Sequence, residues 1–566
     1  MDNTQHENKG VTVGEALVNL LADYGVELVF GIPGTHSIEL YRGLESGRVR
    51  HISPRHEQGG GFMADGYARV SGKPGVCFVI TGPGVTNITT PMGEAYMDSV
   101  PMLVISPVNV PDPKHVNRGR LHEITNQSAV TAPLTAMSVT IEDPDQIPRV
   151  IEQAFNVFSS QRPRPVHINI PLPIFPKRLS GFWEKSPLAE PLRASNTEID
   201  NAIEKINDAD KPVIIAGGGT TKAASALLSL AEKIHCPVLT TVAGRGTMNP
   251  EHPLTVGAQL RTPHVQRLLE EADLGIFVGT EFAQTDHWND DLKLPEQQIW
   301  INLCDHALEQ NDQALTIKAD SGGTMERIAQ RLSKPKENTI KLVNQRCKDI
   351  RALHQSSMTE KETLHWSVLS DIMNVIDPET TIVSDMTQLA YTAVDYLPMS
   401  RPNQWLHPTG YGTLGYALPA AIGATLAKEG SSSLVIVGDA GLQYTLQEMT
   451  LASELGLNVV ILLWNNNALQ QICDDMDNSN IQRTGIFQSN PDFIALAKSC
   501  HWEAYITKKE DLSKELPMEC PTRENSGIDS SSIKSAKKST NPPIRSKGGA
   551  LFSEYPGKLV AMTSWV

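Results

Sequence analysis

Carboxylate and amide side chains follow two apolar segments late in the chain, where they could bind a metal ion. Residues 433–437 run directly into Gly438 and Asp439, and residues 458–464 end in three asparagines that include Asn466. Residues 443–455 between them predict an amphipathic helix, so the two segments predict parallel strands whose carboxyl ends share one sheet edge. Carboxylate and amide oxygens suit Mg²⁺, which is usually completed by water and phosphate. The pattern predicts a metal-diphosphate anchor, with ordinary turns as the alternative.

A second candidate site lies near the start of the chain. Glu57 stands in a Pro-Arg-His-Glu segment between a predicted strand and a glycine-rich helix. Residues 76–81 predict another buried strand, after which Gly82, Pro83 and Gly84 begin a helix whose backbone amides could meet an anionic or polar ligand. A glutamate at such a junction can point into a cleft, although most glutamates are solvated.

These two segments, in this order and at this spacing, give the chain a family resemblance. Residues 10 to 510 resemble the thiamine-diphosphate-dependent enzymes of the acetolactate synthase, benzoylformate decarboxylase and pyruvate oxidase group. In that family the later segment holds Mg²⁺ and the cofactor diphosphate, and Asp439, Asn466 and the Ala468 carbonyl would bind the metal here. The resemblance implies cofactor contacts for Gly82, Pro83, Gly84, Gly438, Asp439, Ala440, Gly441, Asn466 and Ala468.

The resemblance also gives Glu57 a chemical role. The matching glutamate hydrogen-bonds N1′ of the aminopyrimidine and favours the imino tautomer that deprotonates thiazolium C2, so Glu57 would relay protons in general acid/base catalysis. In residues 407–421, the Gly412 carbonyl would accept a hydrogen bond from the 4′-amino group. Leu414 would separate the two cofactor rings, at a position where acetolactate synthases usually carry Met.

Substrate choice is expected to depend on His122 and on acidic residues after the metal loop. His122 stands where acetolactate synthases tend to have Gln, and an imidazole could orient a carboxylate or relay a proton. The alternative is a histidine that only packs in a loop. A cationic substrate would need an acidic pocket, for which Asp474, Asp475 and Asp477 are candidates unless they are a solvated charge run. The pattern resembles the 5-guanidino-2-oxopentanoate decarboxylase subgroup more than a true acetolactate synthase.

The central part of the chain is expected not to bind FAD. Gly217, Gly218 and Gly219 follow an apolar segment, but a lone glycine cluster also serves tight turns and close packing. The flavin-binding motifs of acetolactate synthases are not matched at residues 258–261 or 279–286.

Length and patterning define the elements that must position these sites. A chain of 566 residues suggests about three domains, and alternating strands and helices predict the α/β class, with three doubly wound parallel sheets. We expect a pyrimidine-binding domain at 10–180, a central FAD/NAD-like domain at 195–335 and a diphosphate-binding domain at 362–516. Residues 517–566 are rich in Ser, Lys and Pro, so we expect a disordered tail without the strand that normally completes the third sheet.

Charge and hydropathy exclude several partners. The net charge of -15 disfavours nucleic acid and anionic membranes. Apolar runs of about 18 residues are lacking and the N-terminus is polar, so we expect a cytoplasmic protein. By resemblance, the cofactor would lie between the first domain of one subunit and the third domain of another, in a homodimer or homotetramer.

The leading hypothesis is a thiamine-diphosphate- and Mg-dependent, non-oxidative decarboxylase of a 2-oxo acid such as 5-guanidino-2-oxopentanoate, or a carboligase that acts through the enamine. One alternative is the large subunit of acetolactate synthase in branched-chain amino acid biosynthesis, which would need flavin and a regulatory subunit. Another is a catalytically silent binding or assembly subunit.

Overall fold

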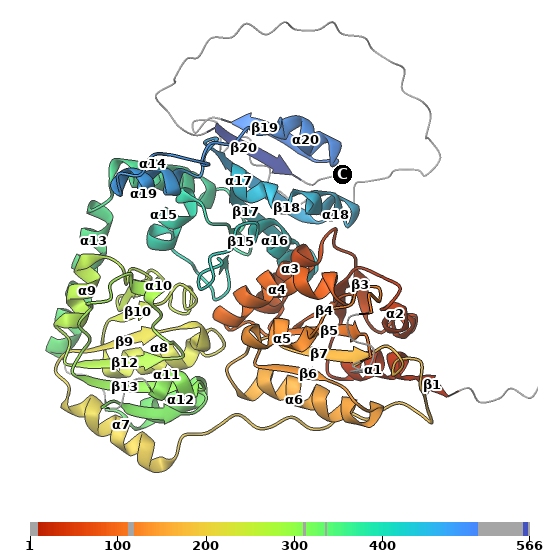
Figure 1. Cartoon of the computed structure of the whole chain (residues 1–566). Coiled ribbons are helices and arrows are strands. Elements are labelled where there is room, and N and C mark those ends of the chain that lie inside the picture. Colours follow the sequence, from red (N-terminus) through yellow and green to blue (C-terminus); the bar gives the residue numbers. More distant parts are fainter. Residues whose placement is uncertain (1–9, 111–117, 310–312, 334–336, 508–557, 564–566) are drawn as a thin grey trace, which may run out of the picture.

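The computed structural model describes residues 10–110, 118–309, 313–333, 337–507 and 558–563. Three six-stranded sheets follow one another along the chain, each flanked by helices (Figure 1). The predicted α/β fold with three parallel sheets is therefore confirmed, although the third sheet has two antiparallel pairings at one edge. In the described ranges, no helix is long and apolar enough to cross a membrane.

The first sheet is parallel, in the order β3-β2-β4-β5-β7-β6. Its strands are β2 (Leu28–Gly31), β3 (Arg50–Ile52), β4 (Gly75–Phe78), β5 (Met102–Val108), β6 (Met137–Thr140) and β7 (Val166–Pro171). Its helices are α1 (Val13–Asp23), α2 (Ile38–Leu44), α3 (Glu57–Ser71), α4 (Pro83–Met97), α5 (Gln127–Thr131) and α6 (Ile147–Ser160), and β1 (Val11–Thr12) pairs with β8 (Arg178–Leu179) beside them. The winding direction reverses between β2 and β4, so the loops after β2, β3 and β4 border the crevice where such sheets bind ligands.

The second sheet is also parallel, in the order β11-β10-β9-β12-β13-β14. Its strands are β9 (Pro212–Ala216), β10 (Val238–Thr240), β11 (Thr255–Gly257), β12 (Leu274–Val278), β13 (Gln297–Asn302) and β14 (Leu315–Lys318). Its helices are α7 (Asn196–Asp208), α8 (Ala224–Ile234), α9 (Pro263–Glu270), α10 (Gln284–His287), α11 (Asp305–Glu309) and α12 (Ser321–Arg331), and α13 (Glu337–Ser356) leads to the third sheet.

The third sheet has the order β16-β15-β17-β18-β20-β19. Its strands are β15 (Thr381–Ser384), β16 (Trp405–Leu406), β17 (Ser432–Gly438), β18 (Asn458–Asn465), β19 (Glu503–Thr507) and β20 (Lys558–Thr563). Its helices are α14 (Glu360–Met373), α15 (Gln388–Tyr396), α16 (Ala417–Leu426), α17 (Asp439–Gln443), α18 (Met449–Glu454), α19 (Gln470–Asn478) and α20 (Phe493–Ser499).

The prediction of a single helix at 443–455 was wrong. The segment ends α17, passes through a 3-10 turn at Leu446–Glu448 and continues as α18. Thr445 separates the two helices with a non-helical backbone, at a φ of -140° and a ψ of 21°. Its buried hydroxyl donates a hydrogen bond of 2.9 Å to the Gly415 carbonyl, so a tertiary contact interrupts the helical pattern.

The expectation that the last 50 residues hold no strand for the third sheet was also wrong. Strand β20 lies between β18 and β19 and is antiparallel to both, and its Met562 side chain is fully buried. Residues 558–563 are mostly apolar, and the composition of the segment before them hid this short strand. The rest of the predicted tail lies outside the described residues. The other strands of the three sheets lie within the predicted domain limits, which stay predictions.

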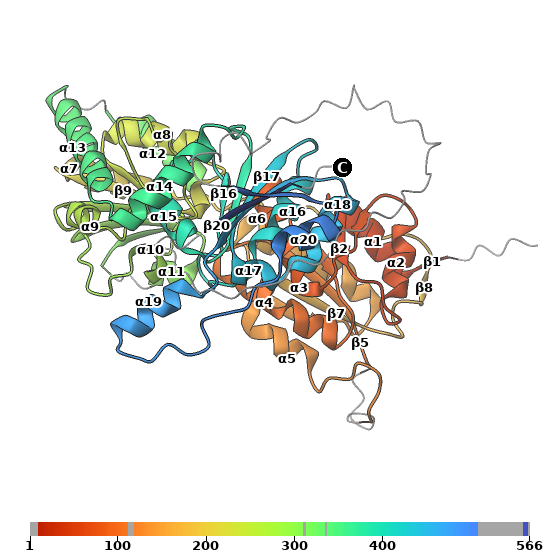
Figure 2. The ribbon, with the colours of Figure 1, turned by 90° about the horizontal axis from the view of Figure 1, so that it is seen from above.

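The first and third parts of the chain pack closely through α3 and α16 (Figures 1 and 2). A Cβ atom at Gly66 would lie 2.0 Å from the Ala420 carbonyl oxygen, and one at Gly423 would lie 1.9 Å from that of Met63. The two backbones can approach this closely only because both positions are glycine. One apolar core therefore continues from the first sheet to the third.

Candidate active site

Glu57 begins α3 at the crevice of the first sheet. Its Oε2 accepts a hydrogen bond of 3.0 Å from the Asn87 side-chain amide on α4. A Cβ atom at Gly84 would lie 3.3 Å from Oε1, so this glycine leaves room beside the carboxylate. The Glu57 carboxylate is thus oriented by a neutral neighbour, as a proton-relaying group needs.

The two residues before Glu57 are held by the third part of the chain. Glu448 is fully buried, and its carboxylate accepts hydrogen bonds of 3.0 to 3.1 Å from the N–H groups of Arg55 and His56. Burial raises the pKa of Glu448 to about 7, although these hydrogen bonds oppose the rise. The segment that leads into Glu57 is therefore fixed before α3 begins.

The backbone of Gly82 makes close contacts with other segments of the chain. Its φ is 70°, and a Cβ atom there would lie 2.6 Å from the His122 carbonyl oxygen. Its N–H, which we expected to face a ligand, donates 2.9 Å to Oε1 of the buried Gln127. The Gln127 amide donates in turn to Ser106 and Asn169, so a buried polar network supports this loop.

His122 forms a pair with a second histidine that the sequence did not single out. Its ring lies 5.2 Å from that of His36, in the loop after β2, at an interplanar angle of 75°. The Nδ1 atoms of both rings are buried and have no hydrogen-bond partner among the described residues. Burial, and then the charge of His122, lowers the pKa of His36. Two imidazoles with unused nitrogens therefore lie beside the Gly82 loop.

Asp439 lies at the carboxyl end of β17, beside the end of β18. Gly438 pairs with Trp464 in the parallel register, so the next residues, Asp439 and Asn465, lie side by side. Both approach Asn490, whose Nδ2 donates to Asp439 Oδ2 at 2.6 Å and to Asn465 Oδ1 at 3.0 Å. A third acceptor, Asn467 Oδ1, lies 3.0 Å from the same nitrogen. Three hard oxygens thus converge, and this donor chemistry suits Mg²⁺.

The predicted ligand Asn466 points differently in this structure. Its Oδ1 accepts a hydrogen bond of 3.3 Å from the Ala468 N–H, and this side chain is not part of the group that surrounds Asn490. Asp439 is nearly fully buried, as is Ala440 after it. The roles of Asn466 and of the Ala468 carbonyl stay predictions.

Two buried acids hold the loop that carries Gly412 and Leu414. The hydroxyl and the N–H of Thr413 both donate to Glu94 Oε2 on α4, at 3.0 and 3.3 Å. Asp385, after β15, accepts hydrogen bonds from the N–H groups of Gly415 and Ala417. Burial raises the pKa of Asp385 to about 6.

Glycine residues permit this arrangement around Asp385. A Cβ atom at Gly441 would lie 2.9 Å from Asp385 Oδ1, and Gly412 itself has a φ of 70°. The loop that is predicted to contact the cofactor is therefore fixed from both sides, by Glu94 and by Asp385.

Helix α19 carries the three candidate acids. Asp474 forms an ion pair with Lys361 at 3.2 Å and accepts from Gln388, and Asp477 pairs with Arg483. Asp475 accepts from Gln471 at 3.1 Å and forms no ion pair with the described residues. Of the three, Asp475 is the one that no cation of the described chain neutralises.

The glycine cluster of the central sheet serves close packing between two loops. A Cβ atom at Gly217 would lie 2.3 Å from the Gly279 carbonyl oxygen, and one at Gly219 would lie 2.8 Å from Gly279 Cα. Glu281, in the same loop, forms an ion pair with Arg162 of the first part of the chain. The glycines are explained without a bound nucleotide.

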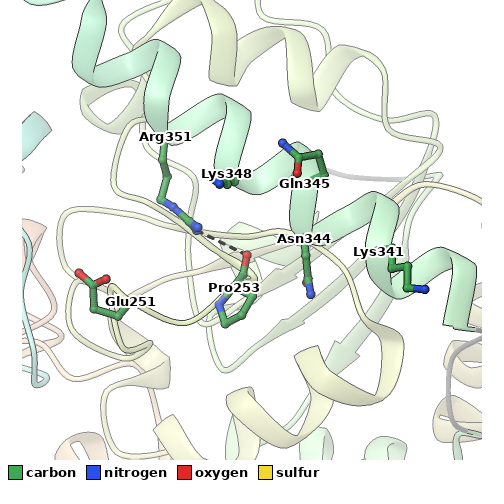
Figure 3. Close-up of a pocket in the computed structure, with 7 residues that line it drawn as sticks. All are labelled: Glu251, Pro253, Lys341, Asn344, Gln345, Lys348 and Arg351. Atoms are coloured by element: carbon green, nitrogen blue, oxygen red, sulfur yellow. Dashed lines mark hydrogen bonds between the residues drawn. The ribbon is translucent and has the colours of Figure 1, made fainter.

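A surface pocket of about 490 Å³ lies elsewhere, along α13 (Figure 3). Its lining includes Lys348 and Arg351, and Arg351 donates a hydrogen bond to the Pro253 carbonyl. The predicted site residues do not line it, so it is separate from the arrangement described above.

Comparisons with known proteins decide which family this arrangement represents. Residues 11–130 match the family described as "Thiamine pyrophosphate enzyme, N-terminal TPP binding domain". Residues 199–328 match "Thiamine pyrophosphate enzyme, central domain", and residues 385–524 match "Thiamine pyrophosphate enzyme, C-terminal TPP binding domain". The chain belongs to the thiamine pyrophosphate enzymes. The family resemblance inferred from the two segments is therefore confirmed.

Relatives within the thiamine pyrophosphate enzymes align along most of the chain. The chain is 45% identical over 512 residues to "Probable 2-ketoarginine decarboxylase AruI" of Pseudomonas aeruginosa. The aligned region covers 89% of this chain and 91% of that protein. It is 31% identical to the acetolactate synthase isozyme 1 large subunit of Escherichia coli, in an alignment that covers 82% of this chain and 84% of that protein. It is 30% identical to the acetolactate synthase large subunit of Corynebacterium glutamicum, with 89% and 83% covered.

Several residues of this thiamine pyrophosphate enzyme were missed by the sequence reasoning. They are His36, Glu94, Asp385, Glu448 and Asn490, and each acts through contacts with residues distant in sequence. Asp385 alone had a signal, because it follows a predicted strand just as Asp439 does. The others stand in helices or loops without a motif.

Proposed function

We propose that this chain is a thiamine-diphosphate- and Mg-dependent, non-oxidative decarboxylase of a 2-oxo acid that carries a guanidinium group, 2-ketoarginine being the leading candidate. The observation that carries the proposal is the 45% identity, over 89% of the chain, to a protein with that printed activity. The identity to the acetolactate synthase large subunits is lower, at 30 to 31%. The carboligase activity considered above belongs to the same chemistry and is the second candidate.

The residues of the first crevice would control the protons. When bound, the cofactor supplies a carbanion and an electron sink for the 2-oxo acid. Glu57, fixed by Asn87, would hold the proton at the aminopyrimidine N1′, as the family resemblance implies. Gly82 and Gly84 would keep the backbone of this loop close to His122 and Glu57, because a side chain at either position would meet these residues.

The metal and the diphosphate would bind at the third sheet. Asp439, with Asn466 and the Ala468 carbonyl, would hold Mg²⁺, and the adjacent Gly438, Ala440 and Gly441 would approach the diphosphate. The proposal is supported by the buried carboxylate of Asp439, which follows β17 directly beside the end of β18 and is a hard oxygen donor that suits Mg²⁺. Gly412 and Leu414, held through Thr413 and Asp385, would position the two rings of the cofactor.

His122 and His36 would meet the reacting end of the substrate. Their buried, unused Nδ1 atoms support this assignment, because a buried polar atom without a partner is costly unless a ligand satisfies it. One imidazole would orient the substrate carboxylate, and the other would hold the proton that the aldehyde product requires.

Asp475 would recognise the guanidinium group. A guanidinium ion pairs well with a carboxylate that no other cation has neutralised, and Asp475 has no ion pair with the described residues. Asp474 and Asp477 are already bound by Lys361 and Arg483. The same carboxylate would disfavour pyruvate, which has no cation to offer.

Two copies of the chain would complete the active site, in a homodimer or a homotetramer. The family resemblance supports this, because it places the cofactor between the first domain of one subunit and the third domain of another. Helix α19 and the loop after it project from the third sheet in Figure 2, where a second copy could cover them.

The enzyme would work without FAD. The proposal is supported by the packing of Gly217 and Gly219 against Gly279, and by the ion pair of Glu281 with Arg162 in the same loop. A silent assembly subunit is disfavoured because Glu57 and Asp439 are retained and β20 lies in the third sheet. The cytoplasmic location stays a prediction.

The test is an assay of the purified full chain with Mg²⁺ and thiamine diphosphate, with and without FAD, with 2-ketoarginine or pyruvate as the substrate. The proposal expects CO₂ and the guanidino aldehyde from 2-ketoarginine, at the same rate with and without FAD. Acetolactate formed from pyruvate only when FAD is present would instead identify a synthase. Absence of turnover with bound cofactor would favour the assembly subunit.

A further inference from the structure

The side-chain amide of Asn490 joins the two loops that carry the assigned metal ligands. Its Nδ2 donates a hydrogen bond of 2.6 Å to Oδ2 of Asp439, which follows β17. The same nitrogen lies 3.0 Å from Oδ1 of Asn465 and 3.0 Å from Oδ1 of Asn467, the residues before and after Asn466. Asn490 therefore limits how far the two loops can move apart.

The orientation of the Asn490 amide follows from Gln443. The Nε2 of Gln443 donates 3.1 Å to the Asp439 carbonyl, which can only accept, and 3.0 Å to Asn490 Oδ1. The oxygen of Asn490 therefore faces Gln443, and its NH₂ group faces the carboxylate of Asp439. A flipped amide would place an oxygen against that carboxylate and an NH₂ group against the donor of Gln443.

The side chains of the assigned ligands keep oxygen atoms for a cation. The Asn490 amide occupies Oδ2 of Asp439, and among the described residues no donor bonds to Oδ1 of the same carboxylate. Asn466 lies outside the group around Asn490, and its Oδ1 accepts one hydrogen bond, from the Ala468 N–H. An amide oxygen has two lone pairs, so this atom can still bind a metal. One carboxylate oxygen and one amide oxygen are thus left open.

Backbone hydrogen bonds hold residues 486–488 beside the same turn without using the third assigned ligand. In these bonds the Leu469 N–H donates at 3.0 Å and the Asn467 carbonyl accepts at 3.5 Å. Ala468, between them, pairs with Phe487 in an antiparallel bridge. The hydrogen bonds on the two sides of this bridge leave the Ala468 carbonyl unused.

We propose that Asn490 is a positioning residue that restricts Asp439 to one metal-binding oxygen and thereby makes the site prefer Mg²⁺ to Ca²⁺. The inference rests on the proposed function, which assigns the cation to Asp439, Asn466 and the Ala468 carbonyl. Mg²⁺ is small and demands nearly octahedral geometry, whereas Ca²⁺ takes more oxygens and often both oxygens of one carboxylate. A carboxylate with one oxygen held by Asn490 therefore suits Mg²⁺ better than Ca²⁺.

The hydrogen bonds of Asn490 act on the cation in two ways. Asp439 is nearly fully buried, and it cannot turn both oxygens to a cation without breaking the short bond to Asn490. Because Asn490 also holds both neighbours of Asn466, the site cannot widen freely for a larger ion. Asn490 is neutral and leaves the negative charge of the carboxylate to the metal. Hydrogen bonds of this kind orient metal ligands, and their loss typically lowers metal affinity by about 10- to 100-fold.

The test is calorimetric titration of the chelator-treated full chain with Mg²⁺ or with Ca²⁺, in the presence of thiamine diphosphate. The wild type should bind Mg²⁺ more tightly than Ca²⁺. Asn490→Leu keeps the size of the side chain and removes both ends of the amide, so the preference for Mg²⁺ should fall by about tenfold, with Mg²⁺ affinity lost more than Ca²⁺ affinity. Gln488→Leu, the same kind of change at an exposed side chain in the same segment, should keep the wild-type preference.

Gln443→Leu supplies a second variant, because it removes the donor that orients the Asn490 amide. It should lower the preference for Mg²⁺ in the same direction by a smaller factor, and thermal unfolding without metal checks that both variants are folded. Equal losses of Mg²⁺ and Ca²⁺ affinity in Asn490→Leu, or a wild type that binds both ions equally well, would overturn the inference and leave the proposed function intact. Wild-type Mg²⁺ affinity in Asp439→Ala would instead overturn the metal site of the proposed function.

Discussion

The Asn87 side-chain amide donates a hydrogen bond of 3.0 Å to Oε2 of Glu57, which links the fifth residue of α4 to the first residue of α3. Glu57 is therefore held in place by one neutral donor, at the crevice where the first sheet reverses its winding direction. The segment that precedes it is fixed by Glu448, which accepts hydrogen bonds from the N–H groups of Arg55 and His56. The position of the proposed relay thus depends on two distant parts of the chain.

Glu57→Gln should bind thiamine diphosphate and lose turnover by about 10² to 10⁴-fold, because the amide keeps the shape but cannot relay a proton. Binding is measured by calorimetry and turnover by CO₂ release. Glu39→Gln is the matched control on the same domain, since Glu39 pairs with Arg42 on the surface. Full activity of Glu57→Gln would remove the relay assignment.

Asp439→Ala should lose the Mg²⁺-dependent retention of thiamine diphosphate, because the carboxylate among the converging oxygens disappears. A chelator should have the same effect on the wild type, and added Mg²⁺ should restore binding only there. Gel filtration with cofactor measurement checks this. Asp477→Ala, at an exposed ion pair, should retain the cofactor, and equal retention in both variants would refute the metal site.

His36→Ala and His122→Ala should each raise KM or change the product ratio without releasing thiamine diphosphate, since the rings lie beside the Gly82 loop. If the two imidazoles act as a pair, the double variant should lose little more than either single variant. His252→Ala in the central sheet region is the control. Wild-type kinetics in both single variants would show that the two histidines only pack against each other and do not act on the substrate.

Asp475→Asn should raise KM for 2-ketoarginine by about tenfold or more, which corresponds to the loss of one charge-assisted hydrogen bond. The KM for an uncharged 2-oxo acid of similar length should stay the same. Asp477→Asn is the control on the same helix. An equal change for the charged and uncharged substrates would contradict recognition of the guanidinium group.

Glu448→Gln should flatten the pH dependence of stability. Burial raises the Glu448 pKa from 4.5 to about 7, so its contribution to stability is full below pH 4.5 and is lost as the pH rises through about 7. The shift corresponds to about 3 kcal/mol of unfolding free energy. Urea unfolding at pH 4.5 and pH 8 should show that the free energy of unfolding falls more between these two pH values in the wild type than in Glu448→Gln. Glu454→Gln, 61% exposed in its side chain, is the control, and parallel falls in all three proteins would exclude this cause.

The sequence predicted the sheets and the ends of strands, because continuous apolar segments and glycine-rich turns are local signals. Gly82 and Asp439 stand directly after such segments and Glu57 follows one within a few residues, so all three could be found. Asn490 and Glu448 could not, since their roles come from partners 51 and about 390 positions away. Strand β20 was missed because an atypical composition precedes it, and the Asn466 side chain is turned by a hydrogen bond from the Ala468 N–H that no motif indicates.

The proposed decarboxylase activity is tested most directly by measuring the CO₂ and aldehyde formed from 2-ketoarginine by the full chain with Mg²⁺ and thiamine diphosphate. We predict equal amounts of both products, and a kcat/KM well above that for pyruvate. Bound cofactor without release of CO₂ from 2-ketoarginine, or a preference for pyruvate, would contradict it.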